Sequence, residues 1–218
     1  MNQKIRLPGG LVERAQPLTF SFNNNKYEGF LGDTLASALI ANNQRFVARS
    51  FKYHRPRGIF SAGSEEPNAL VHLRHGANLE PNTRATVTEL FDGLEATSQN
   101  HRGSLEFDLM AINDFVSPLL SAGFYYKTFM WPKSFWETVY EPIIRASAGL
   151  GNLSNESDPD TYDKGFLNCD VLVIGGGAAG LAAALAAGRS GAQTILADED
   201  FLIGGRLNAE TYEVDGIT

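Results

Sequence analysis

The amino-terminal part of the chain alternates apolar and polar residues with the period of a β-strand. Residues 18–22 (LTFSF) show this alternation, residues 23–26 (NNNK) supply turn formers that tolerate positive φ, and residues 27–30 (YEGF) resume the extended pattern. This order predicts a β-hairpin. Asp33 then precedes the apolar residues 35–40, which predicts a short helix with Asp33 as its N-cap.

Three further segments have the composition of strands: residues 46–48, 68–73 and 84–90. A hairpin, a helix and then further strands indicate a small mixed sheet with a helix across it. A β-grasp domain is therefore the leading candidate for residues 15–97.

The pattern changes after this domain. Residues 108–120 have helical spacing, and residues 124–140 are dense in aromatic side chains and hold both tryptophans of the chain. Two interpretations of the aromatic segment stay open: a packed core or domain interface, and a ring-stacking cofactor pocket. Residues 153–165 (LSNESDPDTYDKG) are polar and rich in turn formers, which predicts a linker.

A nucleotide-binding pattern begins at residues 171–174 (VLVI), an apolar run rich in β-branched side chains that is typical of a buried parallel strand. Gly175-x-Gly177-x-x-Gly180 follows at once, then a helix-forming segment to Arg189 and a second strand at residues 194–197 that ends on Asp198. Strand, glycine triplet, helix, second strand and acidic end in this order predict a dinucleotide-binding βαβ unit.

Each glycine of the triplet has a physical reason. Gly175 permits the tight turn, Gly177 lets the backbone approach a pyrophosphate, and Gly180 lets the helix pack closely on the strand. The phosphates are then expected at the helix N-terminus, where free N–H groups point at them. Asp198 is expected to accept hydrogen bonds from a ribose 2′-hydroxyl, which argues against NADP, whereas the pattern does not separate FAD from NAD.

A second glycine turn follows at residues 204–206 (GGR). It is interpreted either as a wall against the diphosphate or ribose, or as a plain loop. The predicted cofactor-binding residues lie in these two turns and at the end of the second strand: Gly175, Gly176, Gly177, Ala178, Ala179, Gly180, Asp198, Glu199, Gly205 and Arg206. One βαβ unit does not complete a dinucleotide fold of about six strands, so we expect further strands from sequence outside this chain.

Composition narrows the function classes. The chain has 218 residues, a net charge of −7 and one cysteine, Cys169. The acidic balance disfavours attraction to nucleic acid or an anionic membrane, and the apolar run from Val171 fits strand–turn–helix better than a membrane span. A single cysteine excludes an internal disulfide framework and a cysteine-ligated cluster from this chain alone, and it favours the cytoplasm.

Other candidates for chemistry are few. Residues 49–58 (RSFKYHRPRG) cluster basic side chains in an acidic protein, as an anion site or docking surface, or as a solvated loop paired with Glu65 and Glu66. The four histidines are not spaced with carboxylates as a metal site, and no catalytic motif is visible, so no catalytic and no metal-binding residues are predicted.

Several segments together resemble one family, the alpha subunit of heterotetrameric sarcosine oxidase. They cover about residues 7 to 205 and read GDTLASALIAN, RSFKYHRPRGI, EEPNALV, EPNTRAT, AGFYYKTFMWP, YEPIIRASAGLG and CDVLVIGGGAAGLAAALAAG. The resemblance implies a mixed α+β and α/β fold class, with a ferredoxin-like β-grasp domain at residues 1–103. A helical, aromatic-rich connector and linker at 104–165 and the first βαβ unit of a truncated Rossmann-type FAD/NAD(P)-binding domain at 166–218 then follow.

The resemblance also implies a function. The family enzyme oxidatively demethylates sarcosine to glycine and forms hydrogen peroxide, with the one-carbon unit released as formaldehyde or passed to tetrahydrofolate. The alpha subunit is expected to bind NAD, with FAD and FMN on a partner subunit and with beta, gamma and delta subunits as partners. Ala62 lies where related subunits carry cluster cysteines, so no iron–sulfur cluster is expected.

Two alternatives to this function remain open. One is a subunit of an FAD-dependent opine or other amine dehydrogenase. The other is a non-catalytic assembly module. The fragment alone is expected to be inactive.

Overall fold

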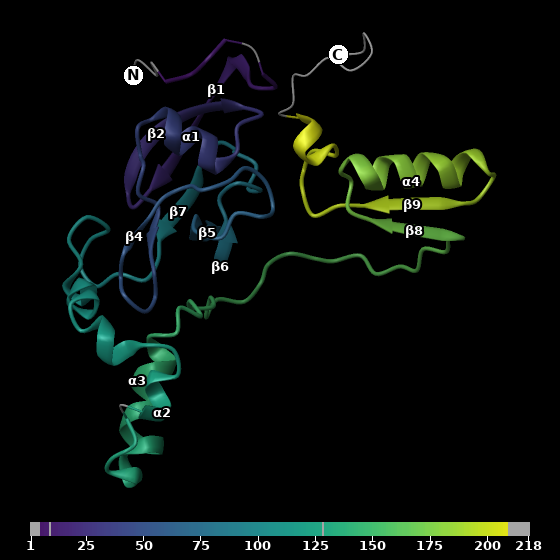
Figure 1. The fold of residues 1–218 in the computed structure, drawn as a ribbon. Helices are drawn as coiled ribbons and strands as arrows, with labels where there is room; N and C mark the ends of the chain where they lie inside the picture. Colours follow the sequence, from purple (N-terminus) through teal and green to yellow (C-terminus); the bar gives the residue numbers. More distant parts are fainter. Residues whose placement is uncertain (1–4, 9, 128, 209–218) are drawn as a thin grey trace.

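The computed structural model describes residues 5–8, 10–127 and 129–208, and the predicted third domain extends to residues 209–218, which lie outside this range. The first domain has a five-stranded sheet with helix α1 (Leu35–Ala41) against it. Figure 1 shows a helical segment that projects from this domain and a separate βαβ unit at the end of an extended connection. The predicted fold class, a ferredoxin-like domain followed by the start of a Rossmann-type unit, is confirmed.

The predicted hairpin is present. Strands β1 (Glu13–Phe22) and β2 (Asn25–Leu31) pair antiparallel. Asn23 and Asn24 join them with φ values of 50° and 64°. Two positive φ values in a two-residue turn match the right-handed twist of the flanking strands, and asparagine adopts them at low cost.

The sheet has the order β2-β1-β7-β5-β6. Strand β7 (Leu94–Ser98) pairs parallel with β1, whereas β5 (Leu70–His75) pairs antiparallel with both β7 and β6 (Asn78–Arg84). Helix α1 (Leu35–Ala41) contributes its apolar side to the same buried cluster as the inner strands. The largest apolar side chains with less than 2% exposure are Phe22, Leu35, Leu39, Val47, Val71, Leu90 and Leu94.

The start of α1 corrects one prediction. Its N-cap is Thr34, which forms a capping box with Ser37, and not Asp33. Asp33 is fully buried, and its two oxygens accept hydrogen bonds from Arg6 at 2.9 and 2.5 Å. An internal arginine partner therefore uses the carboxylate that the sequence pattern assigned to the helix.

Two of the predicted strands are also corrected. Residues 85–90 are not a strand, because their backbone groups bond to the start of α1: Leu35 N donates to Thr88 O and Ala36 N to Ala85 O, both at 2.9 Å. Of residues 46–48 only Ala48 is in a strand, the short β3 (Ala48–Arg49), which pairs with β4 (Pro56–Arg57).

The connector is built from short helices. The predicted helix at 108–120 is two 3₁₀-helices, η1 (Leu109–Asp114) and η2 (Ser117–Leu120), and four short elements follow. None of the described residues in η1, η2, η3, η4 and α3 is buried, and Trp131 is 84% exposed, so the aromatic side chains described in these elements do not form a buried core in this chain. The four later elements are α2 (Phe124–Lys127), η3 (Lys133–Phe135), the π-helix η4 (Trp136–Tyr140) and α3 (Glu141–Ala146).

The extended segment after α3 contacts the sheet of the first domain. Asn82 Nδ2 donates to Gly149 O and Leu150 O at 3.1 Å, and Asn78 Nδ2 donates to Asp160 Oδ2 at 3.0 Å. Both asparagines belong to β6, the edge strand, so part of the predicted linker lies along the edge of the sheet.

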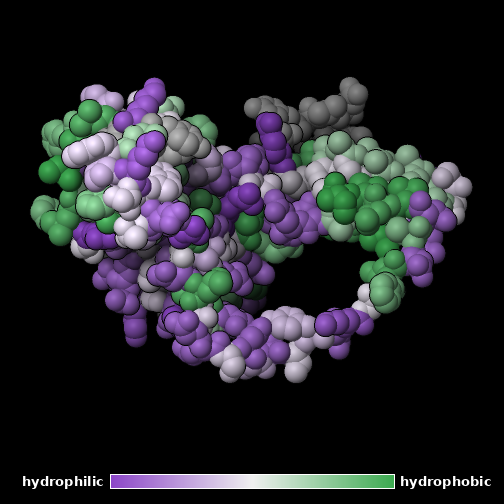
Figure 2. Space-filling model, turned by 90° about the horizontal axis from the view of Figure 1, so that it is seen from below, coloured by the Kyte–Doolittle hydropathy of each residue, from purple (hydrophilic) through white to green (hydrophobic). Residues whose placement is uncertain are grey.

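The βαβ unit contains β8 (Val171–Ile174), α4 (Ala178–Arg189) and β9 (Thr194–Ala197), with β8 and β9 paired parallel. A 3₁₀-turn, η5 (Gly205–Asn208), follows. Leu172 and Ile174 are 57% and 74% exposed, so one face of this parallel pair is uncovered, unlike the fully buried strand that the sequence predicted. Figure 2 shows apolar surface gathered over this unit. No helix among the described residues is long and apolar enough to span a membrane.

Candidate dinucleotide-binding site

The glycine loop joins β8 to α4 in a tight turn. Gly175 has φ +100°, a conformation that favours glycine, and its N–H donates to Ala197 O at 2.7 Å. A Cβ on Gly180 would lie 1.7 Å from Gly175 O. The first turn of α4 therefore lies against the loop backbone at a distance that only a glycine at position 180 allows.

Gly177 differs from Gly180 in what surrounds it. It is the N-cap residue of α4, with φ −72° and ψ −174°, and a Cβ placed on it would meet no atom within 4 Å. The first intrahelical hydrogen bond is Leu181 N to Gly177 O, so the amides of Ala178 and Ala179 precede it. The positive end of a twelve-residue helix thus opens on free space beside Gly177.

Asp198 connects the glycine loop to the end of β9. Its Oδ2 accepts a hydrogen bond from Gly176 N and its Oδ1 accepts one from Asp200 N. These N–H donors, Gly176 first, lower the pKa of the Asp198 carboxyl below its ordinary value. The side chain that the sequence assigns to a ribose therefore fixes the position of the loop in this structure.

The second glycine turn folds back against the first. Gly204 N donates to Gly176 O at 2.9 Å, and a Cβ on Gly205 would lie 3.3 Å from Gly177 Cα. Gly204 and Gly205 have φ values of +130° and +53°. Of the two interpretations of residues 204–206, a plain loop and a wall of the site, this contact favours the wall. Arg206 lies beside it in η5.

Glu199 has a partner from the first domain. Arg84 Nη1 at the end of β6 lies 3.6 Å from Glu199 Oε2, with both side chains partly exposed. No local pattern in the sequence connects these two residues, so Arg84 was missed. All ten predicted site residues lie in or next to the two glycine turns.

The basic loop has internal partners. The buried Arg49 donates to Leu105 O, His54 O and Glu106 O at 2.7 to 2.9 Å, and His54 Nδ1 lies 2.6 Å from Asp108 Oδ2. Arg49 and His54 are therefore not an open anion site. Glu66, one of the two carboxylates with which a solvated loop was expected to pair, accepts hydrogen bonds from backbone N–H groups instead.

Burial alone would raise the pKa of Asp108, but N–H donors from Arg102 and Met110 and the contact with His54 outweigh it and lower the pKa. On the exposed side of the loop, Arg55 pairs with Asp114 at 2.6 Å. No group of three or more His, Cys, Asp or Glu side chains within the described ranges could hold a metal ion.

The loop around Ala62 has a carboxylate at its centre. Glu66 is 1% exposed and accepts hydrogen bonds from four backbone N–H groups, at 2.6 to 3.0 Å. Burial would raise its pKa, but these four donors outweigh burial and lower it. The donors belong to Phe60, Ser61, Asn68 and Ala69.

The structure combines a ferredoxin-like domain with a βαβ unit, and two protein families match these parts. Residues 15–101 match the family described as a 2Fe-2S iron-sulfur cluster binding domain, and residues 170–216 match the FAD dependent oxidoreductase family. The class of protein is thus one in which a ferredoxin-like domain precedes an FAD-dependent oxidoreductase region.

Individual relatives are more specific. The chain is 59% identical over 212 residues to sarcosine oxidase subunit alpha of Rhizobium meliloti (strain 1021), covering 97% of this chain and 22% of the relative. It is 37% identical over 213 residues to the subunit of the same name from Corynebacterium sp. (strain U-96), covering 96% and 17%. The predicted resemblance to sarcosine oxidase alpha subunits is confirmed, and the chain spans about a fifth of the length of these relatives.

A solved structure, L-proline dehydrogenase from P. horikoshii, aligns with a TM-score of 0.49 at 20% identity. The alignment covers 88% of this chain and 26% of that one.

The cofactor prediction is corrected by the family matches. The expectation of no iron–sulfur cluster conflicts with the match of residues 15–101 to a 2Fe-2S cluster binding domain. The match of residues 170–216 to FAD dependent oxidoreductases bears on FAD, which the glycine pattern left open beside NAD. The absence of a cluster was inferred from the number of cysteines, which gives the possible ligands but not the family to which the domain belongs. Residues 15–101 contain no cysteine, since Cys169 is the single one, so this range does not supply the thiolates that hold such clusters.

Proposed function

We propose that the two glycine turns bind the adenosine diphosphate half of FAD. The observation that carries this proposal is the open space at Gly177, at the positive end of α4, where a Cβ would meet no protein atom. A helix N-terminus with free amides attracts a diphosphate, and a glycine there allows the backbone to approach it.

The residues present fit this group. The amides of Gly177, Ala178 and Ala179 would hold the diphosphate, Gly205, which lies against Gly177, would form the wall next to them, and Asp198 would accept hydrogen bonds from the ribose. The match of residues 170–216 to FAD dependent oxidoreductases favours FAD as the dinucleotide. When bound, FAD supplies two-electron redox chemistry through its flavin ring.

At the level of the whole protein, we propose that this chain is the amino-terminal part of an oxidoreductase subunit of the sarcosine oxidase alpha type. Its complex would oxidatively demethylate sarcosine to glycine and form hydrogen peroxide, with beta, gamma and delta subunits as partners in the cytoplasm. The identity to subunits of that name over nearly the whole chain supports this proposal. This proposal includes the three domain ranges: the ferredoxin-like domain at 1–103, the connector and linker at 104–165, and the start of the Rossmann-type domain at 166–218.

A matched pair of glycine variants tests the site. Gly177→Ala introduces a methyl group into space that is free of protein atoms, at φ −72°, so the fold is retained and only the ligand is obstructed. Gly188→Ala places the same methyl group in open space at the far end of α4.

Titration of the purified protein with FAD should show affinity at least tenfold weaker for Gly177→Ala and unchanged for Gly188→Ala. Equal affinity in the two variants would show that the diphosphate does not lie at Gly177.

A further inference from the structure

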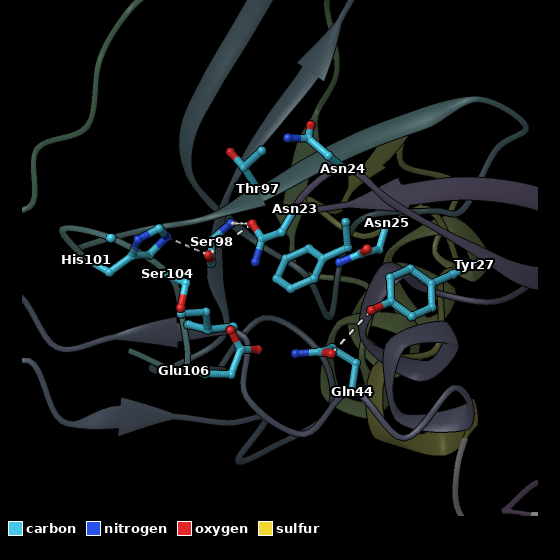
Figure 3. Close-up of a pocket in the computed structure, with 13 residues that line it drawn as sticks. Asn23, Asn24, Asn25, Tyr27, Gln44, Thr97, Ser98, His101, Ser104 and Glu106 are labelled. Atoms are coloured by element: carbon cyan, nitrogen blue, oxygen red, sulfur yellow. Dashed lines mark hydrogen bonds between the residues drawn. The ribbon is translucent and has the colours of Figure 1, made fainter. Parts of the chain in front are cut away.

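A second candidate site lies in the first domain, away from the glycine loop. It is a cleft of about 520 Å³ between the β1–β2 turn and the segment after β7 (Figure 3). This volume is within the range of sites for small organic molecules. The lining residues that carry the argument are Asn23, Tyr27, Gln44, Ser98, His101 and Glu106.

The lining carries one carboxylate and neither a lysine nor an arginine. Figure 3 shows Glu106 and Gln44 extending toward each other from opposite walls, with the ring of Tyr27 above Gln44. Burial, and then the charge of Glu106, raise the pKa of the Tyr27 hydroxyl above its ordinary value. Glu106 therefore acts electrostatically across the cleft.

Hydrogen bonds hold the walls in place. Tyr27 OH donates to Gln44 Oε1 at 3.3 Å, and Asn23 Oδ1 accepts from Ser98 N and Ser98 Oγ at 2.8 and 3.0 Å. Because the one hydroxyl hydrogen of Ser98 is used in this way, His101 Nε2 donates to Ser98 Oγ at 2.8 Å. The Tyr27 ring also stacks on Phe20, with centroids 5.6 Å apart. These contacts fix the positions of the polar lining groups before a ligand arrives.

We propose that this cleft binds an organic ammonium group. A carboxylate attracts the cation, amide and hydroxyl oxygens accept its N–H groups, and an aromatic face adds a cation–π contact. An anion would meet Glu106 with neither a lysine nor an arginine in the lining to offset the repulsion. Two sources share this chemistry: a free alkylamine and a lysine side chain of another protein chain.

The test is a calorimetric titration of the full chain with four probes. Butylammonium represents the free amine and N-acetyl-lysine methylamide represents the lysine side chain, with butanol and N-acetyl-norleucine methylamide as their neutral counterparts. We expect an ammonium probe to bind at least tenfold more tightly than its neutral counterpart. Tighter binding of butylammonium assigns the site to a free amine, and tighter binding of the lysine amide assigns it to a protein partner.

Variants separate this site from general surface charge. Glu106→Gln should abolish the preference for ammonium probes. It should also lower the pKa of Tyr27, which is measured by the absorbance of the ionised phenol. Glu95→Gln, an exposed carboxylate on β7 outside the cleft, should leave both unchanged. A preference that is absent in the natural chain, or that survives Glu106→Gln, overturns the proposal. The outcome is independent of the glycine loop, which lies in the other unit.

Discussion

Glu66 offers the sharpest test of how the first domain is held together. Its carboxylate is 1% exposed and accepts four backbone hydrogen bonds, two on each oxygen. Glu66→Gln keeps the shape of the side chain and one acceptor oxygen. The new NH₂ group faces two backbone N–H groups that then have no acceptor.

The cost follows from these contacts. A hydrogen bond to a charged group contributes about 1.5 to 3 kcal/mol, and two of the four are lost. The other two become bonds to a neutral oxygen. We expect the free energy of unfolding to fall by about 3 to 5 kcal/mol, a large part of the stability of an ordinary domain.

The assay is urea unfolding followed by circular dichroism, with Glu65→Gln as control. Glu65 is the exposed neighbour, so the same substitution there should change stability by less than about 0.5 kcal/mol. A loss below about 1 kcal/mol for Glu66→Gln would refute the reasoning, because buried N–H groups without an acceptor cost more than that.

The pH dependence provides a second readout. The pKa of Glu66 is lowered in the folded state, so its contribution is present above the ordinary carboxyl pKa and is lost as pH falls through the folded-state pKa. The natural chain should therefore lose stability in acid more steeply than Glu66→Gln does. Parallel pH profiles would contradict the assignment.

Two further pairs of variants test the packing of α4 on the glycine loop and the burial of Asp108. Gly180→Ala should destabilise α4 by about 2 kcal/mol or more, because its methyl group meets Gly175 O at 1.7 Å, whereas Gly188→Ala should be neutral or stabilising; amide hydrogen exchange in α4 measures both. Asp108→Asn should cost about 3 kcal/mol, because it removes the buried negative charge that lies 3.8 Å from Arg49 Nε. Asp114→Asn, in the exposed pair with Arg55, should cost less than about 1 kcal/mol. Urea unfolding measures both, and equal costs would contradict the assigned burial.

Local chemistry in the sequence predicted the elements that depend on neighbours along the chain. The hairpin at Asn23 and Asn24, the short helix α1 and the βαβ unit around the glycine triplet each rest on residues a few positions apart. Turn formers, apolar periodicity and glycine spacing are sufficient for such elements.

Non-local contacts account for what the sequence did not predict. Strand β7 has only five residues, with Leu94 and Ala96 as its apolar side chains, and it is a strand because it lies between β1 and β5 in the sheet. Asp33 is a residue type that often caps helices, but its carboxylate binds Arg6, which is distant in the sequence. Arg84 and Glu199 also meet from different domains. Periodicity contains no information on such pairs.

The most direct test of the account is the response of individual backbone amides to ADP. In the ¹⁵N-labelled chain, we expect titration with ADP to shift the amide resonances of Gly177, Ala178 and Ala179 most strongly, with smaller shifts at Gly205. Shifts confined to other parts of the chain, or none at ADP concentrations that saturate ordinary nucleotide sites, would contradict a diphosphate site at the start of α4.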